Sequence, residues 1–286
     1  MSDMISAICV SKPSRFSLLQ RAICNFAAQD HENCELWVGV MDGWYFEKIS
    51  AWLDSDLARE LGLQEKSIKP VLSYKQNMCM VAADAFNQSK GDYIAIWSDD
   101  NLSHSTRLSL QLAKSKECAT VVGMSFYYFY DSDELFITDY RQPGGTFLSK
   151  CAVSSLIVSR DDFCYESLQR GKPTEYWPYI LLRKLALAFP SQKYCHLSEK
   201  EDGLLFMQGV HSDNQRGIAY HRMQGSMLPL TWTREQILAC SHEIDEILGG
   251  YMFPNEIVAV AGRDAAACTI SGSHIRQWPS ELESVY

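Results

Sequence analysis

The sequence has no hydrophobic run long enough to cross a bilayer. Its most apolar stretch, residues 121–130, is too short and too rich in tyrosine for a membrane helix, which needs roughly 20 apolar residues. The N-terminus also lacks a basic segment followed by a long apolar segment, and we therefore expect no signal peptide. These absences predict a cytoplasmic protein with no transmembrane segment.

Cysteines are present, but they lack the spacing of a metal site. None of the 10 cysteines belongs to a C-x-x-C pair, which disfavours a zinc site of the usual kind. Several lie within apolar runs, and we expect them to be buried thiols in a reducing compartment. Internal repeats and low-complexity tracts are missing as well.

An excess of positive charge is also missing. The formal net charge of −9 disfavours tight, non-specific binding to nucleic acid or anionic lipid, although a local basic groove is compatible with this total. The rest of the composition is ordinary for a soluble globular protein, since 47% of the 286 residues are apolar and 21% are charged. This length permits one large domain or two small ones.

Patterns typical of strands and helices alternate over the first 118 residues. Apolar runs predict strands at residues 5–10, 35–41, 68–72 and within 90–97. Pro70 suggests an irregular or edge position for the third of these strands. Apolar residues at helical spacing predict helices after residue 15 and at residues 47–61, 77–87 and 105–118. The alternation predicts a parallel sheet covered by helices.

The fourth apolar run ends abruptly in Asp99 and Asp100. Adjacent carboxylates raise each other's pKa unless a cation lies beside them, and their oxygens suit Mg²⁺ or Mn²⁺, which in turn suit diphosphates. The alternative is a helix N-cap with a second acid beside it. Ligand sites of parallel sheets lie beyond the carboxyl ends of the strands. We therefore expect residues 11–15, Asp42 and residues 98–101 to share one edge of the sheet.

The second half of the chain has weaker patterns. Residues 120–130 and 134–141 predict a β-hairpin, and residues 153–158 predict another strand. Residues 175–188 predict a helix with an apolar face, and a capping box at Thr233 predicts a further helix. After Gly250 no pattern is clear, and we expect a tail or a covering flap there.

The order and spacing of these segments resemble those of the GT-A glycosyltransferases of family 2. The resemblance covers residues 4–115 well and extends more weakly to residue 226. Residues 5–15 resemble the family's first strand and its T-Y-N-R-like nucleotide loop. Residues 35–43 resemble its second strand and D-D-G-S turn, and residues 90–101 resemble the G-[ED]-Y-I segment that leads into the D-x-D region.

Three departures from the family pattern stand out. The turn after the second strand often has two acids in the family, but here it has only Asp42. The A-R-N-x-G stretch is replaced near residues 81–85, which removes a basic residue. Ser98 stands where the D-x-D motif has its first aspartate. Because residues two apart on a strand share a face, we expect Ser98 and Asp100 to point together and Asp99 to point away.

The resemblance implies an α/β fold of the GT-A kind, which is a Rossmann-like, mostly parallel sheet covered by helices. A mixed α+β extension on the acceptor side would follow it towards the C-terminus. The chain would then divide into a nucleotide-sugar-binding half at residues 1–118, an acceptor-side half of the same domain at residues 119–230, and a C-terminal helix and tail at residues 231–286.

The resemblance also implies roles for individual residues. Contacts with the nucleotide-sugar are expected from Ser11, Pro13, Arg15, Asp42, Ser98, Asp99 and Arg222. The expected metal ligands are Asp100 and His211, with Mn²⁺ or Mg²⁺ as the cofactor. If the strand already turns at this point, Asp99 and Asp100 exchange roles. Glu175 is the expected catalytic base, and its alternative interpretation is a first-turn glutamate favoured by the helix dipole.

The implied activity is that of a metal-dependent, inverting glycosyltransferase that moves a hexosyl or pentosyl group from a nucleotide-diphosphate sugar, such as a UDP-sugar, to an acceptor hydroxyl. The acceptor is a polysaccharide, a protein or a hydroxymethylated base of phage DNA, so nucleic acid is expected as a partner only if it is the acceptor. Two alternatives remain. One is a nucleotidyltransferase of similar fold, and the other is a non-catalytic module that binds a nucleotide or a sugar.

Overall fold

The computed structural model describes residues 3–118 almost continuously and shorter segments beyond them. These segments are residues 121–124, 127–130, 134–136, 153–163, 165–169, 178, 194–197, 206–210, 257–260 and 268–270. The predicted helix at residues 175–188 lies outside the described residues except for Pro178, and the helix predicted after Thr233 lies outside them entirely. The division of the chain into three parts stays a prediction.

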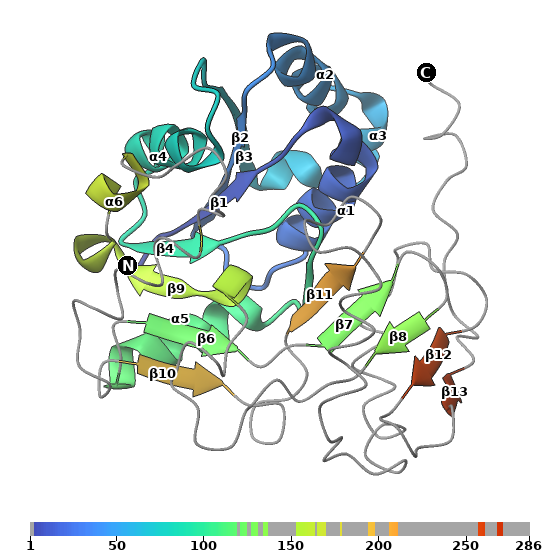
Figure 1. Cartoon of the computed structure of the whole chain (residues 1–286), viewed down its shortest axis with the longest axis vertical. Helices are drawn as coiled ribbons and strands as arrows, with labels where there is room; N and C mark the ends of the chain where they lie inside the picture. The colour runs from blue at the N-terminus through green and yellow to red at the C-terminus, as the bar shows by residue number, and fades with distance from the viewer. Residues whose placement is uncertain are drawn as a thin grey trace.

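A seven-stranded sheet forms the centre of the molecule, in the order β10-β6-β9-β4-β1-β2-β3 (Figure 1). Its strands in chain order are β1 (Ile5–Val10), β2 (Cys34–Val40), β3 (Ser67–Leu72), β4 (Tyr93–Ile96), β6 (Val121–Met124), β9 (Ile157–Ser159) and β10 (Tyr194–Leu197). The pairs β1–β2, β1–β4, β2–β3 and β6–β10 are parallel, whereas β9 runs antiparallel to both β4 and β6. The predicted mostly parallel sheet is therefore confirmed, and Pro70 lies on edge strand β3.

Helices cover both faces of this sheet, because successive residues of the buried strands point to opposite sides. The helices are α1 (Phe16–Ala27), α2 (Gly43–Leu53), α3 (Asp56–Glu60), α4 (Met78–Gln88), α5 (Arg107–Cys118) and α6 (Tyr165–Gln169). Ala7 and Cys9 of β1 lie in the core cluster that includes residues of α1, α2 and α5. Ile8 and Val10 lie in the second cluster, with residues of α4 and α6. Gly39 of β2 permits the approach of α4, since an added Cβ would meet Val81 Cγ1 at 2.6 Å.

Short 3-10 turns complete this part of the fold. They are η1 (Pro13–Arg15), η2 (Leu63–Glu65), η4 (Val153–Ser155) and η5 (Arg160–Asp162). The strand predicted at residues 153–158 is thus a turn followed by β9. The helix predicted at residues 47–61 is two helices, because Ser55 takes an extended conformation and its side chain accepts a hydrogen bond from Ala58 N as the N-cap of α3.

A second sheet of six strands has the order β13-β12-β8-β7-β11-β5. These strands are β5 (Leu102–Ser103), β7 (Tyr127–Tyr130), β8 (Glu134–Phe136), β11 (Phe206–Val210), β12 (Ile257–Val260) and β13 (Cys268–Ile270). The antiparallel pairing of β7 with β8 agrees with the predicted hairpin. Residues 120–130, however, do not form one strand, because β6 pairs within the first sheet and β7 within the second.

After Gly250, where the sequence showed no pattern, the structure describes β12 and β13, which pair with each other. The run from Ile257 to Val260 consists of β-branched residues and one alanine, a composition that favours a strand. In the part of the chain that the structure describes, no helix has the length and apolar character needed to pass through a membrane.

A buried carboxylate holds together the edge of the first sheet where β1, β2 and β4 begin. Glu35, the second residue of β2, is 1% exposed and accepts hydrogen bonds from Ser6 Oγ at 2.7 Å, Lys90 N at 2.8 Å and Lys69 Nζ at 3.3 Å. Burial raises the pKa of Glu35, but the donors around it (Trp37 and the three groups above) outweigh burial and lower the pKa from its ordinary value. Polar contacts to Glu35 therefore hold together the amino-terminal ends of these strands.

Candidate functional site

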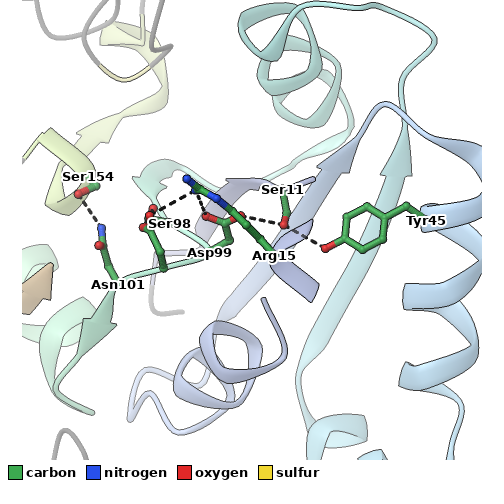
Figure 2. Close-up of polar contacts among 8 residues, drawn as sticks. Ser11, Arg15, Tyr45, Ser98, Asp99, Asn101 and Ser154 are labelled. Atoms are coloured by element: carbon green, nitrogen blue, oxygen red, sulfur yellow. Dashed lines mark hydrogen bonds and ion pairs between the residues drawn. The ribbon is translucent and has the colours of Figure 1, made fainter. Parts of the chain in front are cut away.

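The opposite edge of the sheet brings together three of the predicted segments. Strands β1, β2 and β4 are parallel and end on the same side, so the loops that follow them are neighbours. Residues 11–15 follow β1, Asp42 follows β2 and residues 97–101 follow β4. We call residues 97–101 the acidic loop. The carboxyl ends of these strands lie side by side as predicted, and Figure 2 shows Ser11 and Arg15 of the first segment beside Ser98 and Asp99 of the last.

Direct contacts join residues 11–15, which we call the first loop, to the acidic loop. Ser11 Oγ donates a hydrogen bond of 2.8 Å to Asp99 Oδ2, and Arg15 Nη1 lies 2.9 Å from Asp99 Oδ1. The same Arg15 nitrogen lies 3.3 Å from Asp100 Oδ2. One guanidinium therefore bridges both carboxylates, and Figure 2 shows it extending from the β1 side over the acidic loop.

The acidic loop already turns at its two aspartates. Ser98 Oγ donates a hydrogen bond of 2.5 Å to Asp100 Oδ1, so these two side chains lie together as predicted. Asp99 accepts from Ser11, but its other oxygen meets the same Arg15 nitrogen as Asp100, so it does not point away from Asp100. Strand β4 ends at Ile96 and Asp99 and Asp100 form a turn, which is the alternative that the sequence left open.

The two carboxylates differ in burial and in electrostatic environment. The Asp99 side chain is 3% exposed and that of Asp100 is 10% exposed. Burial and the neighbouring charge of Asp100 raise the pKa of Asp99 to about 6, although Arg15 and the hydrogen bond from Ser11 act in the opposite direction. Both carboxylates are therefore buried, and Asp100 is the more exposed of the two.

Tyr45 extends this network to helix α2, and the sequence did not single it out. Its hydroxyl lies 3.1 Å from Ser11 Oγ, and burial raises the pKa of this phenol above its ordinary range. Asp42 is the N-cap of α2 and accepts a hydrogen bond of 3.1 Å from Tyr45 N. The signal that could have located Tyr45 is the N-cap spacing, because a residue three positions after an N-cap aspartate is fixed relative to the preceding strand end.

The far side of the acidic loop is also anchored. Trp97 is 2% exposed, and its indole Nε1 donates a hydrogen bond of 3.1 Å to the carbonyl of Ala22 in α1. Asn101 Nδ2 donates one of 2.8 Å to Ser154 Oγ in η4 (Figure 2). Both ends of the loop are therefore held while its two carboxylates face the strand edge.

The oxygen donors of this site suit a hard divalent cation. Mg²⁺ and Mn²⁺ are often held by one or two carboxylates, with substrate phosphates supplying further ligands. Asp99 and Asp100 provide two adjacent carboxylates of this kind, both in contact with Arg15. Among the described residues, however, no group of three or more His, Cys, Asp and Glu side chains could hold a metal ion unaided.

The remaining predicted residues are placed as follows. Pro13 begins η1 and is exposed, so it shapes the turn that carries Arg15. Glu175, His211 and Arg222 lie outside the described residues, and their predicted roles stay predictions.

Comparisons with known proteins support the fold. No model of a protein family matches the sequence, and no curated protein is similar to it in sequence. Solved structures do match. Mannosyltransferase PcManGT from Pyrobaculum calidifontis, in complex with GDP-Man and Mn²⁺, superimposes with a TM-score of 0.51 at 12% identity, over 89% of this chain and 67% of that one.

TarS from S. aureus is a second similar structure. Residues 1–349 of TarS superimpose with a TM-score of 0.50 at 13% identity, over 72% of this chain and 60% of that one. The complex of TarS 1–349 with UDP gives the same TM-score at 12% identity, over 87% of this chain and 67% of that one. The chain thus spans 60–67% of the length of these structures. At such identities the similarity establishes the fold alone, and this chain has an α/β fold like that of GT-A glycosyltransferases.

Proposed function

We propose that this protein is a glycosyltransferase that moves a sugar from a nucleotide-diphosphate sugar to an acceptor hydroxyl. The observation that carries the proposal is the pair Asp99–Asp100 at the end of β4, joined to Ser11 and Arg15 at the end of β1. This arrangement lies at the strand edge where α/β sheets bind ligands, on a fold shared with a mannosyltransferase in complex with GDP-Man and Mn²⁺ and with TarS in complex with UDP.

Asp100 is the residue we propose to hold Mn²⁺ or Mg²⁺, because its carboxylate is the more exposed of the pair. The bound cation would act as a Lewis acid on the diphosphate and stabilise the negative charge that develops on it. Ser98 orients Asp100 by donating to Oδ1. His211 would supply a further ligand, on the resemblance alone.

The first loop would bind the nucleotide-sugar beside this cation. Arg15 already carries its guanidinium to the strand edge, where it can meet phosphate oxygens in a charge-assisted contact. Ser11 and Asp99 fix the distance between the ends of β1 and β4, and Asp99 is our candidate for the ribose. Pro13 and Asp42 shape the two turns on either side, and Arg222 would be a second phosphate partner.

Transfer itself requires a base that removes the proton of the acceptor hydroxyl. We propose Glu175 for this role and inversion at the anomeric carbon, both on the resemblance to family 2 enzymes. The transition state resembles an oxocarbenium ion, so a base placed on the face opposite the departing diphosphate favours an inverted product. The acceptor would be a polysaccharide, a protein or a hydroxymethylated base of phage DNA.

The test is a donor assay with a panel of UDP- and GDP-sugars, each with Mn²⁺, with Mg²⁺ and with EDTA. The proposal expects metal-dependent hydrolysis or transfer that releases a nucleoside diphosphate. A nucleotidyltransferase would instead release pyrophosphate when it is supplied with a nucleoside triphosphate and a sugar 1-phosphate. Calorimetry that shows binding, with no product from any acceptor class, would indicate a non-catalytic module. The absence of both binding and turnover for every donor would refute the proposal.

A further inference from the structure

Arg107, the first residue of α5, is the most deeply buried cation described near the acidic loop. It is 1% exposed, and its guanidinium donates three hydrogen bonds. Nε donates to Gln111 Oε1 at 3.0 Å, Nη1 donates to Ser103 Oγ at 2.9 Å, and Nη2 donates to the carbonyl of Ile96 at 2.9 Å. Burial lowers the pKa of Arg107 to about 9, which still leaves it charged at neutral pH. Burying a charge costs free energy, so its retention here needs a reason.

The partners of Arg107 stand on both sides of the acidic loop. Ile96 is the last residue of β4, immediately before the loop, and Ser103 is the last residue of β5, which follows it. The planar guanidinium of an arginine holds several N–H donors in fixed directions, so it can donate hydrogen bonds to two separate segments at once. The guanidinium of Arg107 therefore sets the separation between the two ends of the loop.

A stacking contact adds a third point of support. The Arg107 guanidinium lies over the Trp97 ring, 4.9 Å from its centroid, and Trp97 begins the loop. The Trp97 ring also packs edge-on against the ring of Phe26 in α1, with the two centroids 5.4 Å apart. Trp97, the first residue of the acidic loop, thus packs against both α1 and Arg107.

The same network reaches η4. Gln111, which accepts from Arg107, donates from Nε2 to the carbonyl of Ser155 at 2.6 Å. Ser154, which precedes Ser155 in η4, accepts a hydrogen bond from Asn101 at the end of the acidic loop. These contacts connect Arg107, through Gln111 and η4, with both ends of the acidic loop, and the two carboxylates of the loop contact Arg15.

We propose that Arg107 is a positioning residue that fixes the spacing and direction of Asp99 and Asp100 by gripping both ends of the acidic loop. Its effect on ligand affinity rests on the proposed function, whereas its effect on the loop itself does not. A group that orients a metal-binding carboxylate from behind commonly changes affinity or activity by about 10- to 100-fold. Arg107 touches neither substrate nor metal in this account and acts only through the loop.

The chain offers a matched control at the other end of β4. Arg160 donates from Nε to the carbonyl of Gly91 at 2.5 Å and from Nη2 to Ser89 Oγ at 2.7 Å. It also lies over the Phe86 ring, 4.7 Å from its centroid. Arg160 therefore donates hydrogen bonds to residues that precede β4, whereas Arg107 donates them to the last residue of β4 and to Ser103 after the acidic loop. Arg160 acts at the opposite end of β4 from the acidic loop.

The experiment compares Arg107→Met, Arg107→Lys and Arg160→Met with the wild type in the full chain, at a temperature where circular dichroism shows each to be folded. Amide hydrogen exchange is followed in the peptides that cover residues 97–103 and 89–93. We expect Arg107→Met to accelerate exchange of residues 97–103 by about 10-fold or more, and Arg160→Met to accelerate only residues 89–93. Arg107→Lys keeps the positive charge but lacks the planar, forked donors of the guanidinium, so it should behave like Arg107→Met. If Arg107→Met does not fold, Arg107→Lys alone provides the comparison with the wild type.

The second measurement is calorimetric binding of Mn²⁺ with UDP and of Mn²⁺ with GDP. For whichever nucleotide the wild type binds, both Arg107 variants should weaken binding by about 10-fold or more, and Arg160→Met should not. The proposal is overturned if Arg107→Lys matches the wild type, or if Arg107→Met and Arg160→Met alter residues 97–103 equally. A wild type that binds neither nucleotide would count against the proposed function, and the exchange data would still decide the role of Arg107.

Discussion

Ser11 Oγ donates a hydrogen bond of 2.8 Å to Asp99 Oδ2, although 88 positions separate the two residues in the sequence. This bond ties the end of β1 to the end of β4, which are adjacent and parallel strands of the same sheet. It places the acidic loop beside the loop that carries Arg15, and the proposed metal and diphosphate site lies where these two loops meet.

Replacement of Asp100 by alanine should remove metal-dependent donor binding. The more exposed carboxylate of the pair would be lost, while Asp99 would keep its hydrogen bond from Ser11. Because even indirect supports of a metal site are worth about 10- to 100-fold in affinity, the loss of a ligand should weaken Mn²⁺-dependent UDP or GDP binding at least as much. Calorimetry measures the change. Asp56→Ala, which removes an exposed carboxylate on α3, is the control and should bind like the wild type.

Replacement of Glu175 by alanine should separate binding from chemistry. If Glu175 is the base, the variant should keep the donor affinity of the wild type and lose roughly 10²- to 10⁴-fold in transfer rate. The measurements are calorimetric donor binding and the initial rate of product formation. Glu166→Ala, at an exposed position in the first turn of α6, is the matched control. Normal transfer by Glu175→Ala would exclude this residue as the base.

Replacement of Arg15 by methionine should destabilise the folded protein at neutral pH. Arg15 contacts both carboxylates with its single positive charge, and its side chain is 14% exposed. Its removal leaves the pair without this cation, raises the pKa of Asp99 further, and should cost about 2 kcal/mol in the free energy of unfolding. Urea unfolding at pH 7 tests this expectation. Arg59→Met breaks an exposed pair on α3 and should change stability by less than about 1 kcal/mol. Equal stability of the two variants would contradict the prediction.

Glu35 should contribute stability that depends on pH in a defined direction. Its pKa in the folded protein is lowered from the ordinary value of 4.5, so the contribution is complete above that value and is lost as pH falls through the lower, folded-state pKa. Glu35→Gln should therefore be less stable than the wild type at pH 7, and the difference should shrink below about pH 4.5. Unfolding curves at several pH values measure it. Glu47→Gln, at an exposed position on α2, is the control. A difference for Glu35→Gln that is constant with pH would be inconsistent with this account.

Several elements of the first 118 residues could be predicted because their patterns are local. The apolar run from Ile5 to Val10 forms β1 with the predicted ends, and the helix predicted after residue 15 is α1, in which Leu19, Ile23 and Phe26 are fully buried. The contact of Ser98 with Asp100 was predicted from the period of a strand, and it is present although the chain already turns at these residues. These features depend on neighbours within a few residues.

Other features could not be predicted, since they depend on partners far away in the sequence. Residues 120–130 form one apolar stretch, but β6 and β7 pair in different sheets. Arg107 and Gln111 have the spacing of an ordinary exposed helix pair, and only the fold shows that both are buried behind the acidic loop.

By itself, the sequence determined that strands and helices alternate and that acids follow the fourth strand, because the periods of apolar residues and the turn residues between them are written in consecutive positions. Only the tertiary structure decided which groups surround those acids. Arg15 bridges them and Ser11 anchors one of them. Such contacts exist only after parallel strands 88 residues apart lie side by side, since the short range of a hydrogen bond requires the whole sheet to form first.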